Sequence, residues 1–121
     1  MSKQPKDPAV YVWDMLHEIA FVERALAKSS LYDEVTSRAL LRAFTVLGEA
    51  AKRVNEETKA RTPEIPWQKI IDTRNFLSHE YENINLQKIE QVIQDHFPAL
   101  KNALLALYQH LTGEAYHDDN D

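Results

Sequence analysis

Residues 74–81 read RNFLSHEY and place a cation, an amide, a hydroxyl, an imidazole and a phenol within eight positions. The residues are Arg74, Asn75, Ser78, His79 and Tyr81. These types suit phosphate chemistry. The guanidinium of Arg74 is permanently charged and can bind phosphate oxygens or stabilise the negative charge of a phosphoryl transition state. The imidazole of His79 can take or give a proton near neutral pH.

RNA supplies its own nucleophile, the 2′-hydroxyl, so a general base and a cation could cleave it without a metal ion. On a continuous helix Arg74, Ser78 and Tyr81 share a face, whereas His79 lies about 140° around the axis from Arg74. His79 therefore joins Arg74 only if the helix loosens or ends near Ser78, or if a second copy of the chain completes the pocket across a two-fold axis. Judged on spacing alone, a surface cation and a capping imidazole are the simpler interpretation.

The segments that must position these residues have the pattern of helices. Apolar residues recur every three or four positions over about 8–28 and about 33–58, which is typical of amphipathic helices. Asp7 and Pro8 form a good start for the first helix, an N-cap acceptor followed by proline. Gly48 lies in the middle of the second helix, where glycine costs about 1 kcal/mol relative to alanine. We expect a close approach of another helix there.

Proline, asparagine and glycine predict the remaining boundaries. Pro63 and Pro66 favour an extended link, and Pro66 can open the helix that carries the RNFLSHEY motif. Asn85 can cap a following helix, and Pro98 can restart a last helix that Gly113 stops. We see no strand pattern and no internal repeat, so the sequence predicts an all-α bundle of four or five helices.

Charge divides the chain unevenly. Of its 19 acidic residues, four lie in residues 114–121, so 15 face the 14 basic residues in the rest of the chain. We therefore expect a single near-neutral domain over residues 1–113 and a disordered acidic tail over 114–121. A general basic surface for nucleic acid is absent from this composition, whereas a local basic patch remains possible.

Other residue classes narrow the chemistry further. The chain has no cysteine, which excludes disulfides, thiolate zinc sites and cysteine nucleophiles. His17, His96, His110 and His117 have no partners at metal-ligand spacing, so we predict no metal and no cofactor. The N-terminus has no signal-peptide core, and no apolar run approaches the ~18 residues of a membrane span. We expect a soluble cytoplasmic protein.

Four blocks of the sequence, in order, resemble the HepT-type HEPN ribonuclease toxins. RNFLSHEY fits the pattern of Arg, four residues, His, any residue and Tyr. LGEAAKRVNEE (47–57) resembles the central Gly-Glu-Ala helix of the family, PEIPWQKI (63–70) its link into the motif helix, and HFPAL (96–100) the stretch before its last helix. The similarity covers roughly residues 10–107.

The resemblance implies a HEPN helical bundle, usually a two-fold homodimer, in which the motifs of two protomers face one RNA-cleaving cleft. It implies that Arg74 and His79 are the catalytic pair, with Asn75, Ser78 and Glu49 in supporting roles. A partly buried ion pair is an equally simple interpretation of Glu49. Family members often carry small or apolar residues before the arginine; here Asp72-Thr73 stand there, and Asp72 could pair with Arg74 or repel RNA.

The resemblance also implies a partner. In such type VII toxin–antitoxin systems an MntA-like minimal nucleotidyltransferase transfers AMP from ATP onto the motif tyrosine, here Tyr81, and silences the nuclease. AMP at Tyr81 would place a bulky anion against Arg74, where the RNA phosphate must bind. Lys52 and Arg53 are candidates for contacts with the RNA backbone, although a solvated helix end explains them as simply. The alternative function is a non-catalytic helical module that binds and regulates a nucleotidyltransferase or a nucleotide.

Overall fold

The computed structural model describes residues 7–79 and 85–118, with residues 75–79 described through their helical backbone alone. These parts of the chain form five helices and no strand. The helices are α1 (Pro8–Lys28), α2 (Glu34–Arg53), α3 (Glu56–Arg61), α4 (Trp67–His79) and α5 (Leu86–Thr112). The predicted all-α bundle is confirmed.

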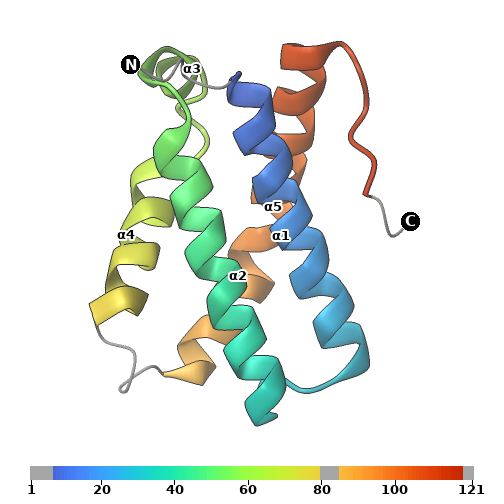
Figure 1. The fold of residues 1–121 in the computed structure, drawn as a ribbon, viewed down its shortest axis with the longest axis vertical. Helices are drawn as coiled ribbons and strands as arrows, with labels where there is room; N and C mark the ends of the chain where they lie inside the picture. The colour runs from blue at the N-terminus through green and yellow to red at the C-terminus, as the bar shows by residue number, and fades with distance from the viewer. Residues whose placement is uncertain (1–6, 80–84, 119–121) are drawn as a thin grey trace, which may run out of the picture.

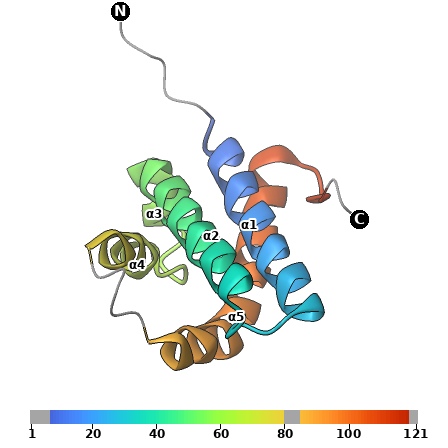
Figure 2. The same cartoon turned by 60° about the horizontal axis from the view of Figure 1, so that its bottom comes forward.

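The helix α2 lies between α1 and α4, and α1 packs in turn against α5 (Figure 1). A view from another direction shows α4 flanking α2 on the side away from α1 (Figure 2). The helix that carries the RNFLSHEY motif is therefore held mainly by its contact with α2.

Aspartate side chains cap the N-termini of α1 and α2. Asp7 caps α1 by accepting a hydrogen bond from the backbone N–H of Ala9 at 2.9 Å, with Pro8 in the first turn, as predicted. Asp33 caps α2, and the hydrogen bonds that its carboxylate accepts from the backbone N–H and the hydroxyl of Thr36 lower its pKa. Such caps satisfy N–H groups that have no partner inside the helix.

The second helix ends earlier than the predicted boundary near residue 58. Val54 adopts an extended conformation and is 2% exposed, and Asn55 then caps the separate short helix α3. The Asn55 side chain accepts a hydrogen bond from the backbone N–H of Thr58 at 2.9 Å. The helix ends here for two reasons. Val54 is buried in its extended conformation, and Asn55 can cap a new helix.

The last helix is longer than predicted, because α5 runs through Pro98 without a break. A proline inside a helix costs about 3 kcal/mol, since it removes one hydrogen bond and crowds the preceding turn. Pro98 is exposed, while Phe97, Leu100 and Leu104 on the same stretch are buried, and their burial offsets that cost. The helix stops at Gly113, which has the left-handed φ of 75° and donates its N–H to Gln109 O at 2.7 Å.

The core is built mainly from α1, α2 and α5, and α4 adds Trp67 and Ile71 to it. Phe44 of α2 and Phe97 of α5 pack with ring centroids 5.4 Å apart. The largest fully buried side chains include Met15, Leu16, Ile19, Leu40 and Leu104. None of the helices in residues 7–79 and 85–118 is long and apolar enough to span a membrane, although α5 has 27 residues.

Residues 114–118 differ from the disordered tail that the sequence predicts. After Gly113 the chain turns back along α1 (Figure 1). The ring of Tyr116 lies 6.0 Å from the rings of both Trp13 and Tyr108. The Asp118 side chain is 3% exposed, and its carboxylate lies 2.8 Å from the guanidinium of Arg24. An aromatic contact and a charge-assisted hydrogen bond together hold this segment despite its acidic composition.

Candidate active site

The contact between α2 and α4 centres on Gly48. A Cβ atom added at Gly48 would overlap the Cβ of Arg74, and it would lie 3.0 Å from the Cγ of Arg74 and 3.1 Å from the carbonyl oxygen of Ile70. Glycine therefore lets the backbone of α4 approach α2 more closely than any other residue would allow. The close helix approach expected at this position is confirmed, and the residue that packs against Gly48 is the arginine of the motif.

Glu49, the next residue on α2, faces the tip of the same arginine. Its Oε1 lies 3.7 Å from Nη2 of Arg74, and the side chains of Glu49 and Arg74 are 38% and 33% exposed. The separation is longer than a direct hydrogen bond, and water screens part of the attraction. The contact fits both interpretations of Glu49, as a residue that orients Arg74 and as a partly buried ion pair.

The helix α4 continues through His79, so it does not loosen between the two motif residues. On this continuous helix, positions 74 and 79 lie about 140° apart around the axis. The side chains of Asn75, Ser78 and His79 lie outside the described residues, and so does the whole of Tyr81. Their predicted roles therefore stay predictions.

The side chains of the two residues before Arg74 form hydrogen bonds within α4 itself. The side chain of Asp72 accepts a hydrogen bond from the amide of Gln68 at 2.8 Å, and the hydroxyl of Thr73 donates to the carbonyl oxygen of Lys69 at 2.8 Å. Positions 72 and 74 lie roughly 160° apart on a helix. Asp72 is thus an exposed residue of the outer face of α4, bonded one turn back along its own helix.

Basic residues cluster near the end of α2, but they differ in their surroundings. Lys59 and Arg61 lie close to acidic residues of their own short helix, at 3.6 Å from Glu56 and 2.8 Å from Glu57. Lys52 and Arg53 are exposed at the last turn of α2. Lys52 follows Gly48 by four positions and therefore lies on the side of α2 that contacts Arg74.

The histidine and carboxylate side chains in the rest of the described structure are too dispersed for a metal site. Within the described ranges, no three His, Asp or Glu side chains are placed to bind one metal ion. His17 instead stacks on Trp13, with ring centroids 4.8 Å apart and planes 11° from parallel. This residue thus packs as an aromatic on α1.

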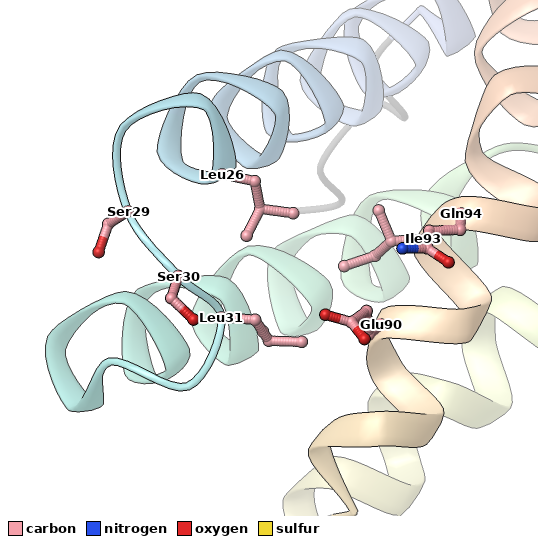
Figure 3. A pocket seen from close by; sticks show the side chains of 7 residues that line it. All are labelled: Leu26, Ser29, Ser30, Leu31, Glu90, Ile93 and Gln94. Atoms are coloured by element: carbon pink, nitrogen blue, oxygen red, sulfur yellow. The ribbon is translucent and has the colours of Figure 1, made fainter.

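A shallow hollow of about 250 Å³ lies where the turn between α1 and α2 faces α5 (Figure 3). None of its lining residues is a site residue predicted from the sequence. They are Leu26, Ser29, Ser30, Leu31, Glu90, Ile93 and Gln94. None of them comes from α4 and none is a cation, so the hollow neither extends the site of Arg74 nor suits a phosphate.

Most of the chain is similar to ribonucleases known by sequence. The family described as "Ribonuclease HepT-like" matches residues 15–107, which include Gly48, Glu49 and the whole RNFLSHEY motif. A candidate RNase of Caldanaerobacter subterraneus subsp. tengcongensis is 31% identical over 86% of this chain and 96% of its own length. A candidate HepT ribonuclease of Thermococcus cleftensis is 29% identical over 84% of this chain and 93% of its own length. No solved structure gives a significant match.

Proposed function

This chain belongs to the HepT-like ribonuclease family, and on that premise we propose that it is a metal-independent endoribonuclease and the toxin of a type VII toxin–antitoxin system. The observation that carries the proposal is the placement of Arg74. The partly exposed side chain of the motif arginine packs against the backbone of α2 at Gly48, and its guanidinium lies 3.7 Å from Glu49. A cation held in this way can still reach a phosphate from solvent.

In the proposed reaction, His79 removes the proton of a ribose 2′-hydroxyl, and the 2′-oxygen forms a bond to the adjacent phosphorus. The bond from phosphorus to the 5′-oxygen breaks, and that oxygen takes up a proton from water. The products are a 2′,3′-cyclic phosphate and a free 5′-hydroxyl. Arg74 stabilises the extra negative charge on the phosphate oxygens as the new bond forms. Asn75 and Ser78 are proposed to shape the site around this pair.

We further propose that the working form is a homodimer. The helical backbone of α4 separates positions 74 and 79 by about 140° around the helix axis, and this separation supports a site built from two copies. A two-fold axis beside α4 would let Arg74 of one copy act with His79 of the other. Lys52 and Arg53, exposed at the end of α2, are proposed to guide the RNA backbone toward this cleft.

The test of the nuclease uses wild-type protein purified without any antitoxin and incubated with cellular RNA in EDTA. We expect cleavage, with 2′,3′-cyclic phosphate ends on the products. The His79→Ala protein, purified in parallel, controls for contaminating ribonucleases. Intact mass must first show that the wild type carries no AMP. Unmodified protein that leaves RNA intact would overturn the nuclease and favour the non-catalytic interaction module, and cleavage that requires added Mg²⁺ would overturn the metal-free mechanism.

Silencing is proposed to occur at Tyr81, through transfer of AMP from ATP by an MntA-like nucleotidyltransferase. The phenol oxygen attacks the α-phosphorus of ATP, pyrophosphate leaves, and AMP becomes ester-linked to Tyr81. We expect Tyr81→Phe protein to cut RNA but to gain no mass when it is incubated with ATP and the cognate enzyme. Tyr32→Phe is the matched control, because Tyr32 is 54% exposed; this variant should still gain AMP and lose activity. AMP on the Tyr81→Phe protein would show that another residue is modified.

A further inference from the structure

We infer that Gly48 is a positioning residue of the nuclease site, because its missing side chain sets the distance between α4 and α2 and thereby the place of the Arg74 guanidinium. The inference rests on the proposed function for its catalytic consequence. Its structural part is that Gly48 forms the contact surface on α2 for the base of the Arg74 side chain, called here the seat of Arg74. This part can be tested without RNA cleavage.

The atoms that crowd Gly48 have little freedom to move. They are the Cβ of Arg74, its Cγ and the carbonyl oxygen of Ile70. A Cβ atom follows its backbone rigidly, and a helical carbonyl oxygen is part of the helix itself. A change of rotamer at Arg74 therefore cannot make room for a methyl group at position 48. Because ordinary carbon contacts are about 3.5–4.0 Å, alanine there must displace α4 from α2 by on the order of 1 Å.

The two ends of the Arg74 side chain thus meet consecutive residues of α2. Its Cβ end rests on Gly48, and its charged end faces the carboxylate of Glu49 at 3.7 Å. If α4 is displaced, the Cβ of Arg74 moves with it, whereas Glu49 stays on α2. The guanidinium must then change its position relative to α4, relative to Glu49, or relative to both. Catalysis is sensitive to such shifts, since a misplacement of about 1 Å can cost on the order of 100-fold in rate.

The test compares wild type with Gly48→Ala on RNA in EDTA. We expect kcat to fall by about 10–100-fold, with KM changed by less than about threefold, because RNA affinity comes from many phosphate contacts. A Gly48→Ala protein that is folded and cleaves RNA at the wild-type kcat would overturn the inference.

Gly113→Ala is the matched control, because Gly113 is the other glycine of the chain. No atom lies within 4 Å of a Cβ placed there, but its φ of +75° disfavours any residue with a side chain. This variant should lose thermal stability and keep the wild-type kcat at temperatures where it is folded. A kcat that falls equally in both variants would assign the effect of Gly48→Ala to stability rather than position.

A second comparison asks whether the effect passes through Arg74. In an Arg74→Ala background, adding Gly48→Ala should change the residual cleavage rate by less than about threefold, because residues that act as a unit are not additive. A further tenfold loss in that background would show that Gly48 acts by another route.

A spectroscopic readout separates this inference from the proposed function. The Nε–Hε resonance of Arg74 in ¹⁵N-labelled protein, assigned by its loss in Arg74→Lys, should shift in Gly48→Ala and stay in place in Gly113→Ala. A shift in a protein whose wild type cuts no RNA would support the seat at Gly48 and overturn the nuclease. An unshifted resonance in Gly48→Ala would overturn the seat, whatever the RNA assay shows.

Discussion

His79→Ala should lower the rate of RNA cleavage by about 10²–10⁴-fold, the usual contribution of a general acid–base residue. The expected loss follows from the proposed role of the imidazole, because the 2′-hydroxyl is a poor nucleophile until a base removes its proton. Alanine has the highest helix propensity, so the substitution should leave α4 helical. The measurement is the single-turnover cleavage rate in EDTA, with circular dichroism to confirm the helical content.

Two comparisons make the role of His79 specific. His96→Ala removes an exposed histidine that lies on α5, outside the motif, and should keep the wild-type rate. Free imidazole in the buffer should restore part of the rate of His79→Ala, because a small base can enter the space that the side chain leaves. If His79→Ala cuts RNA as fast as wild type, the imidazole is not the base and the reaction proposed for this motif is wrong.

The parts of the fold that sequence predicted are those that depend on neighbouring residues. Asp7 caps α1 through the N–H of Ala9, two positions away, and Gly113 stops α5 with a left-handed φ. Both signals are local, because the capping side chain or the required backbone angle belongs to the boundary residue itself. The order of the helices followed from the same local signals and from the spacing of apolar residues.

The parts that sequence missed depend on contacts between distant positions. Asp118 is buried because it meets Arg24, 94 positions earlier, and Pro98 stays inside α5 because the opposite face of that helix is buried. Composition alone gave the last residues the appearance of a disordered tail. The same limit applies to the site. The sequence predicted a close helix approach at Gly48, but it could not tell that the approaching residue is Arg74.

Arg74→Ala should lower kcat by about 10²–10³-fold, as expected when a preorganised donor to a developing negative charge is removed. Arg74→Lys should recover only part of this loss, because an ammonium offers a point charge in place of a planar fork that can bind two phosphate oxygens at once. The measurement is kcat and KM for both variants on one defined RNA in EDTA.

The structure also predicts that this loss will not come from unfolding. Alanine keeps the Cβ atom that rests on Gly48, so the packing of α4 on α2 is preserved. The ion pair with Glu49 spans 3.7 Å between side chains that are one-third exposed or more, and such pairs contribute about 0–1 kcal/mol. The melting temperature of Arg74→Ala should therefore stay within a few degrees of wild type while cleavage is nearly lost. A variant that cuts RNA normally would remove Arg74 from the reaction, and one that unfolds would show that the arginine is needed for the α2–α4 contact itself.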